Sequence, residues 1–554
     1  MTLTETRPEA VTVDPPADAP GRVGTWLDTT DHKKVGQLFI FAALAFCVAG
    51  GVVGEVLGLE HAKSGIDLVG NDFGRFFSFH ATVMTMLFLT PLWLGIATYI
   101  VPLQIGATRV ALPRLQAFSC WMLIGGGGGL ITSYCISSPD GLGLSIANPA
   151  LAVNNPALAA RADDATNLWI LSLAAIALAT VLACVGLLTT IATERADGMT
   201  YLRLPAFTLS ILAFAGGMIL ATPVFLGGLL LLFVSEHNGL RFFGPGHGAL
   251  IAYQHTLWIF GRPEIFLLLL PALGVACEIV ATAAKRTLLP DHRIVAGLLF
   301  AYASLSFLVW AGGNKVASAV VLPTATIGSA AVVAPLGLLA LLWLGTLGLA
   351  AKEKSLQPSV NLAWVVGFVL AMLLGGLAAA AIALFDKAHV IGGTTWTTGF
   401  AHLVAFGAPT LLAVGALWHW SPKIWGRAFS QLAGALTFLL LFGGVAALTG
   451  GQLWGGWDDV PAAAKNVGGL KQGPQVVAAI GGALVILGIV VLVLEILRVA
   501  VLKRGKEAGN DPYGGLSLEW ATTSPPPTHN FESLPEIRSA APLADLRSYA
   551  GGAN

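Results

Sequence analysis

The chain has 554 residues, of which 55% are hydrophobic and only 11% are charged, and its formal net charge at pH 7 is zero. Soluble globular proteins carry about 25% charged residues, so this composition excludes an ordinary soluble domain and predicts a protein that crosses a membrane several times. The balanced charge gives no indication of a nucleic-acid partner, and membrane lipid is the expected surrounding.

Twelve apolar runs are long enough to cross a bilayer, which requires about 20 apolar residues per helix. The predicted fold class is therefore all-α, a polytopic bundle of about 12 transmembrane helices. We expect this membrane domain over residues 31–503, an N-terminal tail over 1–30 and a C-terminal tail over 504–554, both tails of low order because they are polar and contain proline. In chain order the predicted spans lie near 36–59, 76–103, 117–138, 168–193, 207–234, 252–283, 294–314, 327–350, 361–385, 397–420, 430–450 and 474–502.

Basic residues gather in the loops that follow the even-numbered spans. The positive-inside rule makes that side cytoplasmic. An even number of spans then predicts that both termini are cytoplasmic, in a multi-pass protein of the inner (cytoplasmic) membrane of a bacterium. The residues that carry this prediction are Lys33, Lys34, Arg109, Arg114, Arg195, Arg203, Lys285, Arg286, Arg293, Lys352, Lys354, Lys423, Arg427, Lys503, Arg504 and Lys506.

Two predicted spans each carry a histidine close to their outer end. His80 lies a few residues into the second span and His402 a few residues into the tenth. At 1.5 Å per residue, both imidazoles lie about 6–8 Å below the same membrane surface. A histidine at membrane depth is costly without a partner, and it is therefore a candidate functional residue. The residues alone leave two interpretations open: axial ligands of one haem iron, or two histidines hydrogen-bonded inside a helix bundle.

Long motifs resemble subunit I of the haem–copper oxidases, the cytochrome c oxidase family. In order they are TTDHKKVG, FHATVMTMLF, VPLQIGA, YQHTLWIFGRPEIFLLLLP, HLVAFGAPTLLAVGALWHWSPKIWG and DPYGGLSLEWATTSPPPTHNF. The resemblance covers nearly the whole chain. It implies a role in aerobic respiration, other respiratory subunits as partners, and cytochrome c or a cupredoxin as electron donor. It also implies that His80 and His402 hold one low-spin haem, with type a as the form that the family suggests.

The family's oxygen-reducing centre combines a second, high-spin haem with a copper ion, and its ligand positions are changed in this chain. The family motif GHPEVY reads GRPEIF here, which places Arg262 at a copper-ligand position and Phe266 at the redox tyrosine. Gly312 and Gly313 stand where the family has two further copper ligands, and Phe400 stands where it has the high-spin haem ligand. Glycine, phenylalanine and a protonated guanidinium have no lone pair for a metal. We therefore predict that copper is absent.

The residues that serve proton transfer in the family are also altered. Leu339 matches the family's channel lysine, and Arg109 matches the aspartate at the mouth of the second proton route. Gly392 and Gly393 replace the histidine and aspartate of a magnesium site. Glu264 matches the family's gating carboxylate. Because the residues of the proton route that leads to it are changed, we expect this carboxyl group to be protonated or paired with a neighbour and not to take part in a pump. No catalytic residue is therefore assigned.

Arg262 is predicted to lie inside a membrane span, where a charge requires compensation. We hypothesise that its guanidinium occupies the former copper space and pairs with Glu264, a haem propionate or another anion. The alternative is that it turns aside toward a backbone carbonyl or the edge of the bundle.

Three functions remain compatible with the sequence. The preferred one is a subunit with a single bis-histidine haem and an electron-transfer or structural role in a larger respiratory complex. The second is a functional, proton-translocating cytochrome c oxidase subunit I that reduces oxygen. The third is a haem-handling or transport protein on the same scaffold.

Overall fold

A computed structural model describes residues 24–62, 67–137, 164–238, 266–312, 321–384, 391, 393–462 and 471–551. Within these ranges the regular secondary structure is helical, apart from two isolated β-bridges, which agrees with the predicted all-α class. The elements are α1 (Gly24–Leu27), α2 (His32–Ala62), η1 (Gly70–Asp72), α3 (Phe73–Leu87), α4 (Leu89–Gln104), α5 (Pro113–Ile136), α8 (Asp164–Thr193), η3 (Tyr201–Arg203), α9 (Ala206–Asn238), α13 (Leu269–Ala284), α14 (His292–Gly312), α15 (Val321–Lys352), α16 (Val360–Leu384), α17 (Thr395–Phe400), η4 (Ala401–Gly407), α18 (Ala408–Trp425), α19 (Gln431–Trp457), α20 (Gln472–Ile496), η6 (Leu497–Val501), η7 (Leu518–Ala521) and α21 (Pro542–Gly551).

Among the described residues, nine helices are long and apolar enough to cross a membrane. Two shorter apolar helices, Leu269–Ala284 and His292–Phe307, overlap the predicted spans 252–283 and 294–314. The predicted span 117–138 coincides with the glycine-rich helix α5. The chain is thus a polytopic helical membrane protein, and the count of twelve spans remains a prediction.

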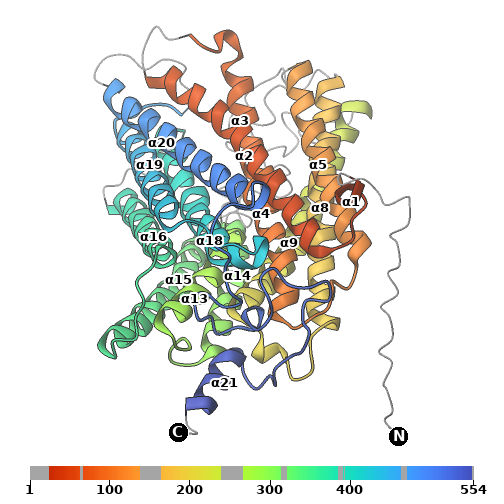
Figure 1. The fold of residues 1–554 in the computed structure, drawn as a ribbon. Helices are drawn as coiled ribbons and strands as arrows, with labels where there is room; N and C mark the ends of the chain where they lie inside the picture. The colour runs from red at the N-terminus through yellow and green to blue at the C-terminus, as the bar shows by residue number, and fades with distance from the viewer. Residues whose placement is uncertain are drawn as a thin grey trace, which may run out of the picture.

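The long helices lie side by side, with α19 and α20 on one flank of the bundle and α5 and α8 on the other (Figure 1). Between these flanks, α2 packs against α3, α4 and α20. The segment Phe73–Gln104, which comprises α3 and α4, is the centre of the bundle, because its 18 most apolar consecutive residues are all buried. The segment Thr395–Trp425 is the next most enclosed, since 78% of its corresponding 18 residues are buried. The two candidate histidines therefore lie on the two most enclosed spans.

Glycines allow α19 and α20 to approach closely. A Cβ on Gly444 would lie 2.7 Å from the backbone nitrogen of Val485 and 2.9 Å from the carbonyl oxygen of Gly481. Small residues at membrane helix contacts permit such backbone approach. The high glycine content thus serves helix packing at this interface.

Residues 503–551, the C-terminal segment, cover one end of the bundle, and α21 follows at the lower edge of Figure 1. The Lys33 ammonium at the start of α2 donates to the carbonyl oxygens of Pro527 and Thr528 and to the amide oxygen of Asn530, at 3.1–3.2 Å. Trp520 is 2% exposed. The prediction of a C-terminal tail of low order was therefore wrong, because buried cations of the bundle bind its backbone. Residues 1–23 lie outside the described part of the chain.

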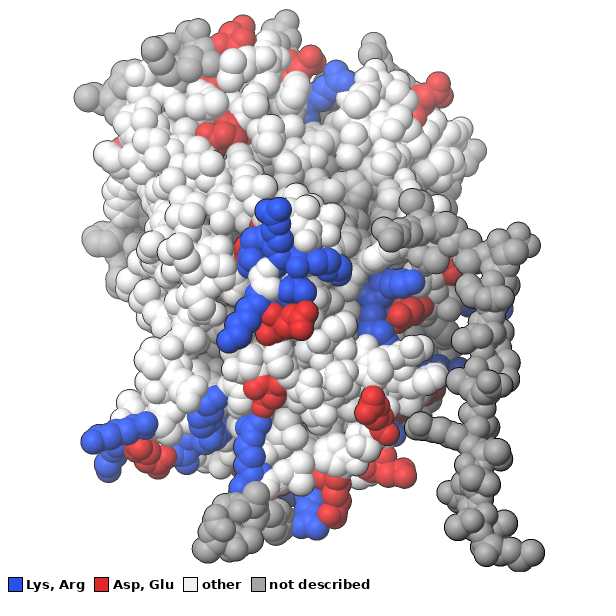
Figure 2. Space-filling model, viewed as in Figure 1, with Lys and Arg blue, Asp and Glu red and all other residues white. Residues whose placement is uncertain are grey.

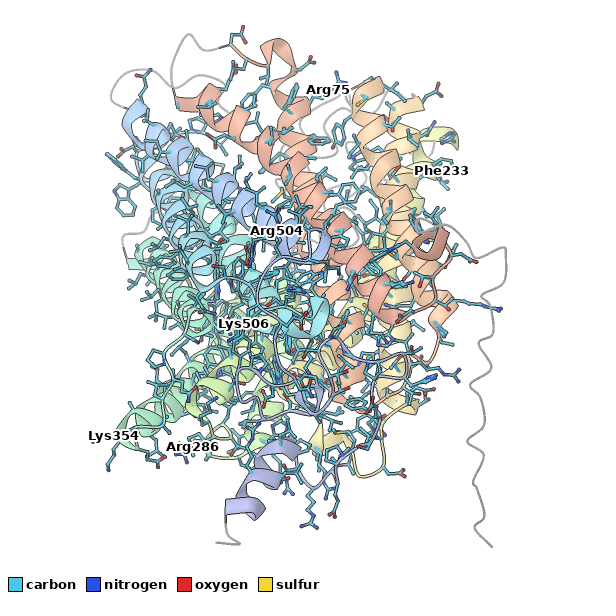
Figure 3. The ribbon with its side chains drawn as sticks, in the orientation of Figure 1. Arg75, Phe233, Arg286, Lys354, Arg504 and Lys506 are labelled. Atoms are coloured by element: carbon cyan, nitrogen blue, oxygen red, sulfur yellow. The ribbon has the colours of Figure 1, made fainter. Side chains whose placement is uncertain are left out.

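Charged side chains leave a broad uncharged surface on the face shown in Figure 2, as a lipid-facing protein requires. Basic residues gather where α20 and η6 end, and Figure 3 labels Arg504 and Lys506 there. Lys354 and Arg286 lie at the lower end of the same view.

Candidate site at a histidine pair

The two histidines singled out from the sequence lie next to each other in the structure. His80 is on α3 and His402 is on η4, a stretch of π-helix between α17 and α18. Their ring centroids are 6.0 Å apart and the ring planes are inclined at 72°. Two spans that are far apart in sequence therefore present a pair of imidazoles at one point in the bundle.

Each imidazole is held through its Nδ1 atom. The Nδ1 of His80 lies 2.8 Å from the carbonyl oxygen of Gly50 on α2, and the Nδ1 of His402 lies 2.8 Å from Oε1 of Gln452 on α19. Because both partners are oxygen acceptors, each Nδ1 carries the proton and donates it. The neutral ring then keeps its lone pair on Nε2, which is the arrangement found around metal-ligating histidines.

Local backbone features hold the two rings in place. A Cβ on Gly54 would lie 2.5 Å from Cε1 of the His80 ring, so only glycine lets α2 approach this imidazole. The π-helix around His402 is an uncommon local geometry that often marks functional positions. It brings the carbonyl oxygen of His402 so close to Gly407 that a Cβ there would lie 2.7 Å from it.

The spacing of the pair fits a metal ion between the rings. An imidazole nitrogen lies about 2.0–2.1 Å from a bound metal and about 1.1 Å from its own ring centroid, so two axial imidazoles should be about 6.3 Å apart by centroid. The observed 6.0 Å agrees within a few tenths of an ångström. Both side chains are only partly covered by protein. Within the described residues, neither ring hydrogen-bonds the other.

Of the five changed positions of the family's oxygen-reducing centre, three fall in the described part of the chain. Phe400 ends α17, two residues before His402, and packs against the hydrophobic core. Phe266 also packs against the core, and Gly312 ends α14.

Arg262, Glu264 and Gly313 lie outside the described residues, as does Gly392. The hypothesis that Arg262 pairs with Glu264 or another anion therefore remains untested.

The altered proton-route positions that are described have ordinary structural surroundings. Leu339 is fully buried in the core on α15. Arg109 is exposed in the loop between α4 and α5. Gly393 has a φ of +86°, a left-handed conformation that favours glycine.

Some residues at the site were not found from the sequence. Gln452 and Gly54 carry no recognisable motif of their own, and their roles depend on how α19 and α2 pack beside the histidines. The local signal that was available is the position of Gly54 at membrane depth on the first span, near the level expected for His80. A glycine at such a depth is also common where helices merely pack closely.

These features define a polytopic helical membrane protein with a half-buried imidazole pair between its spans. The description "Cytochrome C and Quinol oxidase polypeptide I" is that of the family model that matches residues 34–490. The chain belongs to this family of membrane proteins, which implies haem binding, electron transport and respiration.

Relatives and a solved structure agree with this membership. The chain is 32% identical over 547 residues to a protein of Streptomyces avermitilis named as a subunit 1-beta of cytochrome c oxidase, covering 96% of this chain and 94% of that protein. It is 31% identical to cytochrome c oxidase subunit 1 of Corynebacterium glutamicum, covering 94% and 88%. A heme-copper terminal oxidase dimer has the same fold, with a TM-score of 0.70 over 94% of this chain and 89% of that one, at 15% identity.

Proposed function

We propose that this chain carries a single low-spin haem between His80 and His402, lacks the oxygen-reducing haem–copper centre, and serves electron transfer or structure within a larger respiratory complex. The observation that carries the proposal is the imidazole pair with centroids 6.0 Å apart, each ring held through Nδ1 by an oxygen acceptor. Membership of an oxidase family supports haem as the bound group.

The side chains determine what the bound group can do. A haem iron supplies reversible one-electron transfer, and its potential depends on its axial ligands and their hydrogen bonds. The Gly50 carbonyl and the Gln452 amide oxygen keep both imidazoles neutral and oriented, with Nε2 available as the donor atom. A haem held by both His80 and His402 would have no ligand position left for oxygen.

The changed residues support the loss of the second centre. Four ligand positions that the family resemblance implies are filled by Arg262, Gly312, Gly313 and Phe400, none of which can donate a lone pair to a metal. Phe266 has no hydroxyl where the family has a redox tyrosine. Simultaneous change at all five positions favours a chain that never assembles the copper site.

The same proposal includes the setting of the protein. Twelve spans with both termini on the cytoplasmic side follow from the even count and the positive-inside rule. The bacterial relatives support the inner cell membrane as the location. Other oxidase-type subunits are the expected partners, with cytochrome c or a cupredoxin as electron donor and type a as the haem form.

Optical spectroscopy and metal analysis of the purified full chain test this proposal. We expect a single low-spin haem whose reduced spectrum does not change with carbon monoxide, and no stoichiometric copper. His80→Ala and His402→Ala should each abolish the low-spin bands, whereas His237→Ala, at an exposed position at the end of α9, should leave them unchanged. A carbon monoxide-binding haem with equimolar copper would instead establish a functional oxidase. Absence of haem from the wild-type chain would favour a transport role on the same scaffold.

A further inference from the structure

Two acidic side chains come near each other where the C-terminal segment covers the bundle, because Ser517, which bonds one of them, lies two residues before the other. Glu278 lies on α13 and is 7% exposed, and Glu519 lies on η7 and is fully buried. An isolated buried carboxylate is costly, and two close together are costlier still because their charges repel. Either a nearby cation or a bound proton must therefore compensate the negative charge of this pair.

Neutral groups supply the hydrogen bonds to both carboxyl groups. Glu278 accepts from the backbone nitrogen of Phe207 and from the Ser517 hydroxyl, both at 3.2 Å. These donors orient the carboxyl group, but they add no positive charge.

Glu519 is bound in the same way. Its Oε1 accepts from Nε2 of Gln104 and Nε1 of Trp420, both at 3.1 Å. Its Oε2 is buried and has no hydrogen-bond partner within the described part of the chain. An ionised carboxylate would leave this oxygen charged and unsatisfied, whereas a protonated one would leave a far smaller penalty.

A cation that attracts Glu519 makes its hydrogen bonds elsewhere. Lys423 on α18 attracts Glu519 electrostatically, but its ammonium donates to the carbonyl oxygens of Asn510 and Thr522, each at 2.7 Å. Cys277, the neighbour of Glu278 in the sequence, carries no positive charge that could compensate a carboxylate. Among the described residues, no lysine or arginine forms an ion pair with either carboxyl group.

Ser517 links the two groups along the chain, because its hydroxyl donates to Glu278 and it lies two residues before Glu519. A serine hydroxyl has one proton and can donate to only one acceptor. The bond to Glu278 therefore uses the only proton that this hydroxyl can give. Burial, the main cause, raises the pKa of the Glu519 carboxyl, which favours its protonated form.

We propose that Glu278 and Glu519 form a proton-binding site, in which two buried carboxyl groups hold one proton between them and thereby keep the C-terminal segment docked on the bundle. Loss of that proton to water leaves two like charges in a buried interface. Because the proton is bound more tightly in the folded state than in the unfolded one, the docking free energy is largest at low pH and falls as the pH rises through the folded-state pKa.

Limited proteolysis of the full-length protein in lipid or detergent, between about pH 6 and about pH 9, tests this proposal. We expect cleavage within the C-terminal segment to accelerate by about tenfold or more in the wild type over this range. Glu278→Gln and Glu519→Gln, neutral mimics of the protonated group, should each remove most of this acceleration. The matched control is Glu532→Gln, an exposed glutamate of the same segment, which should behave as the wild type.

Infrared spectroscopy provides a second and independent measurement. The wild type should show a protonated-carboxyl band that disappears at high pH and whose position or intensity is changed in each Gln variant that folds. An unchanged band in both variants, or equal pH dependence of cleavage in wild type and both variants, would overturn the proposal. Haem content is read separately, so neither result depends on the histidine site.

Discussion

Substitution of Gly54 by alanine should displace the His80 ring while leaving the histidine itself unchanged. The new Cβ would lie 2.5 Å from Cε1 and 2.6 Å from Nδ1 of the ring. Non-bonded carbon atoms prefer separations of about 3.5–4.0 Å, so the ring or α2 must move by about 1 Å. The Nδ1 bond to the Gly50 carbonyl would be strained by the same movement.

The size of the effect follows from this overlap. Overpacking in a rigid interior costs about 1–3 kcal/mol, which corresponds to roughly 5–150-fold in haem affinity if the strain falls on the ligand. Alanine also favours a helix over glycine by about 0.5–1 kcal/mol. A loss of haem would therefore report the collision and not a weaker helix.

The assay is haem content per chain and the low-spin absorption bands of Gly54→Ala after purification. Gly51→Ala is the matched control, since Gly51 lies on the same helix, three residues before Gly54. A Cβ on Gly51 would meet only Ile486, at 4.0 Å. Retention of haem and unchanged bands in Gly54→Ala would refute the assignment of His80 as a ligand oriented by α2.

Three further predictions concern the surrounding structure. Gln452→Leu removes the acceptor of His402 Nδ1 and should weaken haem binding by about 10–100-fold in a haem titration. Lys423→Met leaves the carbonyl oxygens of Asn510 and Thr522 without their donor, and should raise protease cleavage of the C-terminal segment by about 100-fold for a cost of about 3 kcal/mol. Gly444→Val should destabilise the α19–α20 contact by about 1–3 kcal/mol in a thermal unfolding assay, whereas Gly443→Val, with open space around it, should not.

Each of these has a result that would contradict it. Gln452→Glu keeps an acceptor and should retain haem, so equal loss in both variants would point to a packing role for Gln452. Protease resistance unchanged in Lys423→Met would mean that the segment docks through its aromatic side chains alone. Equal melting of the two glycine variants would remove the close-packing explanation.

The sequence was sufficient for the fold class and for the location of the histidine pair. Apolar runs report the spans directly, because a bilayer imposes length and polarity on each helix. The sequence also yields an expected depth for His80 and His402, since depth depends only on residue count from the membrane surface. The lateral distance of 6.0 Å between them depends on bundle packing, which no single span encodes.

The partners of the histidines could not be predicted for the same reason. Gln452 lies on α19 and Gly50 on α2, and their proximity results from how whole helices pack. The π-helix at His402 is likewise a backbone adjustment within an apolar run whose composition suits an ordinary α-helix.

The C-terminal segment was predicted wrongly because its composition resembles that of a disordered tail. Its order comes from contacts with the bundle, chiefly the ammonium groups of Lys33 and Lys423 on backbone carbonyl oxygens. Carbonyl acceptors belong to every residue, so a sequence gives no signal of which ones a distant lysine will bind.

The bonds from Lys33 to the C-terminal segment have a consequence for biosynthesis. Lys33 and Thr528 are 495 positions apart, so the ribosome must translate nearly the whole chain before this lysine finds its acceptors. Until then, a cation at the start of the first long helix stays hydrated at the membrane surface. Premature termination anywhere upstream of Pro527 removes all three acceptors and leaves that helix end unsealed.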